Sequence, residues 1–391
     1  MVRKHLRPSD ARAVVQLATQ ATRGVTQMVE GVHQSVWATL GAPAGKTAEQ
    51  TRGITGMVYQ SIHAVTQLIG KGFYTALRQL EQRLPATMLE ASTTSSYPRE
   101  AVLAALNGVM GDRLLASANP FATPMTLRLD NQALETANMP DATAVTGKVL
   151  ILIHGLCMND LQWTAQHADA LSAALGYTPV YVRYNTGLHI SQNGAALTQQ
   201  LAMLQQHWPR NITDITVLAH SMGGLVTRSA LQQAQQQGLK WPAFLKSVIF
   251  LGTPHHGAPL ERAGNWVDVL LGATPYSAPF KKLGQLRSAG ITDLRYGLVQ
   301  ADRRTPVPLP DTIAFYTIAA TTAAKRSRIA DRLLGDGLVP LNSALGLHQD
   351  AIKTLHFAST HQRIVYQTNH MALLTSPVVT QQLLQWLGKR D

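Results

Sequence analysis

The sequence predicts an α/β fold in which a mostly parallel central sheet is flanked by helices. Continuous apolar runs, typical of strands buried on both faces, occur at Lys148–Ile153, Ser247–Leu251 and Ile313–Ala319. Helix-like segments and glycine-rich turns separate these runs. A fourth strand and a helix meet at a sharp turn that contains Ser221. This alternation of strand and helix signals favours parallel pairing over an all-β or all-helical fold.

Residues 1–90 differ from the rest of the chain and are expected to form an amphipathic helical hairpin. Apolar residues recur at helical spacing over residues 14–36 and 54–80, and the turn GAPAG at 41–45 separates the two stretches. Two antiparallel helices are therefore predicted. Their apolar stripes would pack on each other, on the rest of the protein, on a second copy or on a membrane surface.

Residues 91–391 are expected to form the α/β domain. A helix-like segment at Ala101–Leu115 precedes Met125–Leu129, which predicts the first hairpin of the sheet with its turn at Asp130-Asn131. An insertion at about 259–310 is rich in helix signals. Its position after a core strand predicts a cap or lid whose apolar faces line a binding pocket.

The segment around Ser221 carries the strongest functional signal. The sequence Ala219-His220-Ser221-Met222-Gly223 matches a strained strand-to-helix turn that lifts a serine Oγ out of the sheet. Ile215–Leu218 is a β-branched strand before it, and Gly224–Gln237 is an apolar-periodic helix after it. Motif and context agree, so Ser221 is predicted to be a nucleophile.

A nucleophilic serine needs two donors for the oxyanion that forms on its substrate. Lys148–Ile153 runs directly into His154-Gly155-Leu156, where Gly155 lets the chain turn away from the strand. The backbone amides of Leu156 and Met222 are the predicted donors. His154 is expected to order this loop rather than to act as a base.

The same serine needs a base and an orienting acid. Asp336 lies between two glycines after the strand Ile313–Ala319, and Thr354–Phe357 leads by a loop to Asn369-His370-Met371. Asp331 is an alternative acid, although it lies in a charged run typical of a solvated surface. Asp336 is preferred, because it is placed at a loop tip before an apolar segment.

The chain contains 14 histidines, and several of them are alternatives to His370 as the base. His370 is followed by an apolar helix start, which favours it. Of the others, His220 lies beside the predicted nucleophile, His255 and His256 follow the end of an earlier strand, and His361 comes too early in the loop.

Taken together, these motifs resemble the bacterial lipase and esterase branch of the α/β-hydrolases, including the GPI-inositol deacylase family. The matching segments are IHGL at 153–156, AHSMGG at 219–224, LGTPHHG at 251–257, DGLVP at 336–340 and NHMALL at 369–374. The resemblance covers about Met125 to the C-terminus. It implies that Ser221 is the nucleophile, His370 the general base and Asp336 its orienting acid, with no metal or organic cofactor. Ala219 replaces the glycine usual at the start of the turn.

Composition limits the remaining classes. The chain has 391 residues, 45% hydrophobic and 14% charged, which is enough for a large core. The single cysteine, Cys157, excludes an intramolecular disulfide framework. The net charge of +12 comes from scattered Lys and Arg without a nucleic-acid motif, so it indicates attraction to anionic lipid or substrate, or simple solubility.

No signal peptide and no uninterrupted apolar stretch near 18 residues is evident, so a cytoplasmic protein is expected, with peripheral membrane contact through the hairpin as an open alternative. The predicted activity is hydrolysis of carboxylic esters with lipid-like acyl groups. Alternatives on the same triad are an amidase, a thioesterase or an acyltransferase. A non-catalytic lipid- or partner-binding protein on this fold is the alternative from another class. The oligomeric state is left open.

Overall fold

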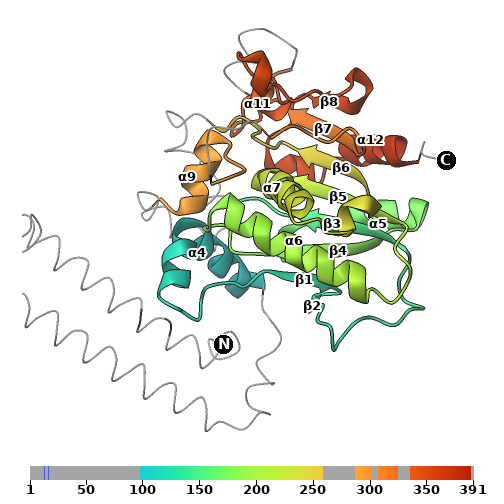
Figure 1. Cartoon of the computed structure of the whole chain (residues 1–391). Helices are drawn as coiled ribbons and strands as arrows, with labels where there is room; N and C mark the ends of the chain where they lie inside the picture. The colour runs from blue at the N-terminus through green and yellow to red at the C-terminus, as the bar shows by residue number, and fades with distance from the viewer. Residues whose placement is uncertain are drawn as a thin grey trace, which may run out of the picture. The chain divides into compact units, whose positions relative to one another are not determined.

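Eight strands form one mostly parallel sheet, the fold class that the sequence predicts (Figure 1). The computed structural model describes Ala13, Gln16 and residues 97–258, 287–301, 307–324 and 335–388. The strand order is β2-β1-β4-β3-β5-β6-β7-β8, with β1 antiparallel to β2 and to β4 and every other pair parallel. The strands are β1 (Thr126–Leu129), β2 (Gln132–Ala133), β3 (Lys148–Ile153), β4 (Thr178–Arg183), β5 (Asp214–His220), β6 (Leu245–Leu251), β7 (Ala314–Ala320) and β8 (Gln362–Val365).

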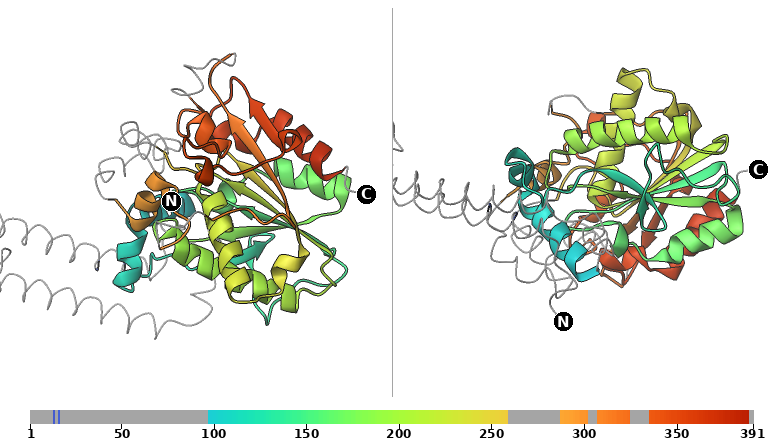
Figure 2. Two further views of the ribbon diagram at one scale, coloured as in Figure 1. Left: turned by 45° about the horizontal axis from the view of Figure 1, so that its top comes forward. Right: turned by 90° about the horizontal axis from the view of Figure 1, so that it is seen from below.

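Helices cover both faces of this sheet. Figure 2 shows α6 (Ile190–His207) and α7 (Met222–Gln236) on one face, and α5 (Ala165–Leu175) and α12 (Pro377–Leu387) on the other. The remaining α-helices are α4 (Tyr97–Ala116, kinked at Met110), α9 (Ala289–Tyr296) and α11 (Leu341–Ala344). Single 3-10 turns occupy Asp160–Gln162, Trp241–Phe244, Ala351–Lys353, Ser359–His361 and Met371–Leu374.

Each face of the sheet has its own apolar core. Alternate residues of β3 belong to the two cores, because successive side chains of a strand point to opposite faces. Val149, Ile151 and Ile153 pack with residues of α6 and α7. Leu150 and Leu152 pack with residues of α5 and α12. Burial on both faces explains why β3 is a continuous apolar run rather than an alternating one.

The predicted strands at the centre of the sheet and the first hairpin are confirmed. Asp130 and Asn131 both have positive φ (49° and 63°), as a two-residue hairpin turn requires. Thr354–Phe357, which precedes the loop of His370, is not a strand. That segment is irregular, and its Leu355 and Phe357 are buried as loop residues. The last strand of the sheet is β8. It begins with the polar residues Gln362 and Arg363, so the sequence pattern does not indicate a strand there.

Two predicted features fall mainly outside the described residues. Of the helical hairpin predicted for residues 1–90, the structure describes only Ala13 and Gln16. Of the cap predicted at 259–310, it describes residues 287–301, which include α9, and residues 307–310. The chain divides into two compact units, Met1–Ser96 with Leu114–Phe121, and Tyr97–Arg113 with Ala122–Asp391. No helix in the described ranges has both the length and the apolar character needed to span a bilayer.

Candidate active site

Ser221 lies in the turn between β5 and α7, at the carboxyl edge of the central strand. Its backbone has φ 55° and ψ −124°, outside the regions that residues with side chains prefer. Such a conformation costs about 1–3 kcal/mol and persists only where surrounding contacts enforce it. One such contact is a hydrogen bond of 2.9 Å from the Ser221 amide to the carbonyl of Leu251, the last residue of β6.

The glycines after Ser221 allow the helix to approach the sheet. A Cβ at Gly223 would lie 2.5 Å from the carbonyl oxygen of Ile153 and 2.8 Å from that of His154. A Cβ at Gly224 would collide with the Thr253 side chain. Larger residues at either position would push the start of α7 away from β3 and β6. Close packing of α7 against the sheet therefore requires glycine at both positions.

Asp336 and His370 form a buried pair. His370 Nδ1 lies 2.6 Å from Asp336 Oδ2, and the two side chains are 2% and 1% exposed. The other carboxylate oxygen, Oδ1, accepts from the amides of Leu338 (2.9 Å) and Val339 (2.7 Å). Because a carboxylate only accepts hydrogen bonds, the pair holds the imidazole proton on Nδ1 and leaves Nε2 as an acceptor.

The acid–base pair is also joined through the main chain. The His370 amide donates to the Asp336 carbonyl at 3.1 Å, and Asn369 Oδ1 accepts from the Ala372 amide at 2.9 Å. His370 Nε2 is buried and has no hydrogen-bond partner among the described residues. The ring is therefore held by its hydrogen bond at Nδ1, and Nε2 is left without a hydrogen bond. This is the state in which an imidazole takes a proton.

The end of β6 contacts both the turn of Ser221 and the acid–base pair. The Leu251 carbonyl accepts from the Ser221 amide, and Gly252 follows it with φ 57°. A Cβ on Gly252 would lie 3.1 Å from His370 Nδ1 and 3.2 Å from Asp336 Oδ2. Sequence reasoning missed this role of Gly252, although a glycine directly after a buried strand is a recognisable signal.

Replacing Gly252 with alanine should reduce any turnover that depends on the Asp336–His370 pair by about 10²-fold, because the new Cβ displaces the pair and small misplacements have effects of that size. Gly238→Ala is the matched control. Gly238 has a similar φ of 64°, but nothing lies within 4 Å of the position its Cβ would take. Steady-state kinetics and thermal melts of both variants separate backbone strain from crowding. Equal activity of the two variants would contradict the role given to Gly252.

The loop after β3 lies against Ser221. A Cβ on Gly155 would be 2.9 Å from Ser221 Cβ and 3.5 Å from its Oγ. The Cys157 amide donates to Thr186 Oγ1 at 3.2 Å and the Met158 amide to the Gly155 carbonyl at 3.4 Å. By contrast, the amides of Leu156 and Met222 have no hydrogen-bond acceptor in the described part of the chain. Neither predicted donor is therefore engaged by another described residue.

Two buried histidines support this arrangement. The Tyr184 hydroxyl donates a hydrogen bond to the His154 carbonyl at 2.7 Å, and the His154 ring stacks on the Tyr184 ring. The His220 ring lies 4.6 Å from the His370 ring, and its Nε2 is 3.2 Å from the His370 carbonyl. Burial lowers the pKa of His154 to about 4, and burial with the nearby His370 lowers the pKa of His220 well below its usual range. Both are neutral at pH 7 and position neighbouring groups.

The other candidates lie elsewhere. His255 is buried beneath Phe250, His256 contacts the Gly346 carbonyl, and His361 contacts the Phe315 carbonyl. None of these three is hydrogen-bonded to Asp336. Asp331 lies outside the described residues. Cys157 is buried, which raises the pKa of its thiol to about 12 and makes it a packing residue rather than a nucleophile.

Sheet order and the serine turn at the end of β5 define the class of the protein as an α/β-hydrolase fold. A family model described as a domain of unknown function, DUF7379, matches residues 121–293. No curated protein matches the chain.

Solved structures of lipases, esterases and thioesterases are distantly similar. The mature form of Bacillus licheniformis lipase BlEst2 shares 19% identity at TM-score 0.44, over 68% of this chain and 98% of that one. A Pyrobaculum calidifontis esterase shares 12% at TM-score 0.41, over 61% and 74%. The RedJ thioesterase from Streptomyces coelicolor shares 16% at TM-score 0.38, over 70% and 98%.

Proposed function

We propose that the protein is a serine hydrolase that cleaves carboxylic esters through Ser221, His370 and Asp336. The observation that carries the proposal is the buried Asp336–His370 pair, which is held beside the end of β6 that also fixes the Ser221 turn. The backbone of Ser221 supports the same proposal, because strained residues of this kind cluster at active sites.

In the proposed reaction, His370 Nε2 accepts the Ser221 proton while Oγ forms a bond to the acyl carbon. Asp336 keeps the Nδ1 proton in place and stabilises the imidazolium. The tetrahedral intermediate then expels the alcohol, which takes the proton from His370, and an acyl-enzyme remains. Water attacks this ester with His370 again as base, so that the carboxylic acid leaves and Ser221 regains its proton.

The amides of Leu156 and Met222 are the proposed oxyanion donors. Their support is that neither has an acceptor among the described residues, whereas the amides of Cys157 and Met158, which follow Leu156, are bonded. Met222 is the first residue of α7, so its N–H points out of the helix N-terminus and the helix dipole favours negative charge there. Each donor of this kind contributes about 3–4 kcal/mol to stabilisation of the transition state.

A lipid-like acyl group is the proposed substrate class. Its support is in the sequence: the insertion at 259–310 contains apolar helix-like stretches such as Trp266–Leu271, in the place where an acyl pocket would be covered. Long acyl chains gain about 0.8 kcal/mol for each buried CH₂ group. Affinity should therefore rise with acyl length until the pocket is full.

A panel of p-nitrophenyl esters from acetate to palmitate, with an emulsified triacylglycerol, tests the proposal on the full-length protein. We expect ester turnover, with kcat/KM higher for medium or long acyl chains than for acetate. The matching p-nitroanilides and acyl thioesters serve as comparisons. Turnover of thioesters or anilides without turnover of esters would reject the ester assignment, and no turnover of any substrate would favour a binding protein.

A further inference from the structure

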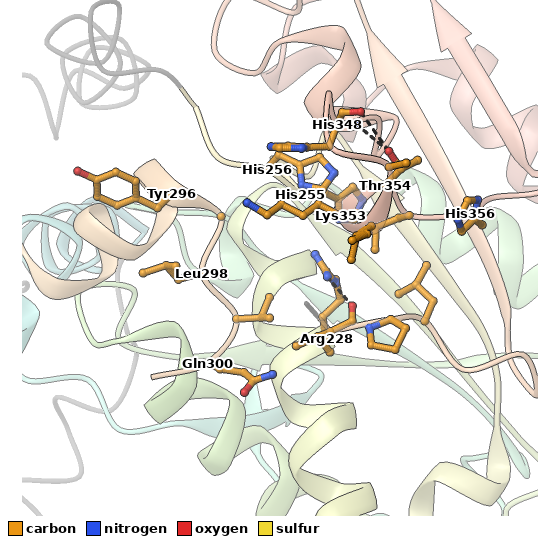
Figure 3. A pocket seen from close by; sticks show the side chains of 18 of the residues that line it. Arg228, His255, His256, Tyr296, Leu298, Gln300, His348, Lys353, Thr354 and His356 are labelled. Atoms are coloured by element: carbon orange, nitrogen blue, oxygen red, sulfur yellow. Dashed lines mark hydrogen bonds between the residues drawn. The ribbon is translucent and has the colours of Figure 1, made fainter. Parts of the chain in front are cut away.

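A cavity of about 500 Å³ lies beside α7, and none of the three proposed triad residues lines it. Its walls come from α7, from the loop after β6, and from residues 296–300, 307–311 and 348–356. Figure 3 shows the side chains of Arg228, His255 and Lys353 directed toward the same space. The proposed ester chemistry makes no use of this cavity.

Arg228 is the central feature of the cavity. The residue is 6% exposed, and burial lowers its pKa to about 10, which still leaves it charged at pH 7. Its Nη2 donates to the Val307 carbonyl at 2.9 Å, whereas Nε and Nη1 are buried without any hydrogen-bond partner. A buried cation with unsatisfied donors is costly, and no carboxylate forms an ion pair with it in the described residues.

Other side-chain donors line the same cavity. His255 is 2% exposed, is held between the Phe250 and Phe357 rings, and has both ring nitrogens unpartnered. The Nε2 of Gln300 is also buried without a partner. Lys353 adds an exposed ammonium at the rim.

The charge of the lining favours an anion. Among the described lining residues, Asp311 is the only carboxylate, and it is exposed. The two positive charges of Arg228 and Lys353 therefore exceed the single negative charge of Asp311, and Arg228, His255 and Gln300 each have an unpartnered buried nitrogen. A ligand with several anionic oxygens would satisfy them, because guanidinium groups bind such oxygens with strong, charge-assisted hydrogen bonds.

We propose that this cavity is a binding site for a phosphate group, with Arg228 as its buried anchor. Phosphate is favoured over carboxylate because it offers more acceptor oxygens to the donors of Arg228, His255 and Gln300. The group would come either from free phosphate or from a small phosphate monoester. Either source would contact His255, which lies three residues beyond Gly252 in the loop beside the acid–base pair.

Titration of the full-length protein with inorganic phosphate tests the proposal. Calorimetry and thermal melts should show saturable binding and a rise in Tm, at ionic strength held constant with chloride. Glycerol 3-phosphate in a parallel titration distinguishes the two sources: tighter binding than inorganic phosphate indicates a monoester site. Acetate that binds as tightly as phosphate would overturn the phosphate assignment, as would the absence of saturable binding.

Arg228→Met removes the charge and keeps a long side chain. We expect phosphate affinity to fall at least 10-fold, while Tm without phosphate stays equal or rises because a buried unpaired cation is gone. Arg363→Gln is the matched control: it removes one positive charge at an exposed position on β8 and should bind phosphate normally. Unchanged phosphate binding by Arg228→Met would overturn the proposal.

A structural role for Arg228 makes a different prediction. If its bond to the Val307 carbonyl held the 307–311 segment in place, Arg228→Met would lower Tm to the same extent with and without phosphate. Lys353→Gln covers the case in which Arg228→Met fails to fold. Since Lys353 is exposed at the rim, its variant should keep the wild-type Tm and weaken phosphate binding about 3-fold. Full affinity in Lys353→Gln together with a misfolded Arg228→Met would reject the site.

Discussion

Replacing Ser221 with alanine is expected to lower ester turnover by about 10⁶-fold, the scale seen when a nucleophilic serine is removed. In the proposed reaction Oγ is the atom that attacks the acyl carbon, and alanine lacks it. Folding should be unaffected. Alanine is no more strained than serine at φ 55°, and Oγ makes no hydrogen bond to another described residue.

Two measurements check this result. Initial rates with a p-nitrophenyl ester give the loss of kcat, and mass spectrometry after treatment with a fluorophosphonate shows whether a covalent adduct forms. Ser172→Ala is a matched control, because its Oγ on α5 is also without a partner but lies away from the serine turn. Near-normal turnover or labelling of Ser221→Ala would show that another group is the nucleophile.

Asp336→Asn should reduce kcat by about 10⁴-fold. The asparagine oxygen would keep the bonds from the Leu338 and Val339 amides, which turns its NH₂ group toward His370 Nδ1. A facing donor forces Nδ1 to accept, so the imidazole proton moves to Nε2. An imidazole in that tautomer cannot take the Ser221 proton.

Asp331→Asn is the natural comparison, since Asp331 was the alternative acid. It should retain turnover close to that of the wild type. Thermal melts of both variants would show whether lost activity reflects lost folding. An inactive Asp331→Asn beside an active Asp336→Asn would reverse the assignment of the acid.

The parts of the site that sequence predicts well are those encoded by neighbouring residues. The turn at Ser221 depends on a strand, a serine and small residues that follow one another directly, so the pattern and its structure coincide. Asp336 and His370 could be singled out for a similar reason. Each stands in a loop with glycine or asparagine before it and an apolar segment after it. Their 2.6 Å contact joins residues 34 positions apart, and only the fold could reveal it.

The parts that sequence missed depend on residues distant in the chain. β8 is a strand because it pairs with β7, although its first residues are polar. Gly252 looks like an ordinary turn glycine until His370 and Asp336 are placed against it. Arg228 lies on a helix with apolar periodicity, where an arginine is normally assigned to the surface. Its burial arises from segments around Val307 and Leu355 that cover that face of α7.

The position of β8 sets how the protein would respond to heat. β8 is a four-residue edge strand, paired on one side only within the described sheet, and it leads into the loop of His370. Ser221, by contrast, follows a central strand that is paired on both sides. Local opening of a sheet begins at short, partly exposed edges. His370 and Asp336 are hydrogen-bonded to each other. Opening of this edge would therefore displace both side chains together, and closing would restore both. Any activity that depends on this pair would therefore fade reversibly below the temperature of global unfolding, and its upper temperature limit would reflect the stability of this edge rather than that of the core.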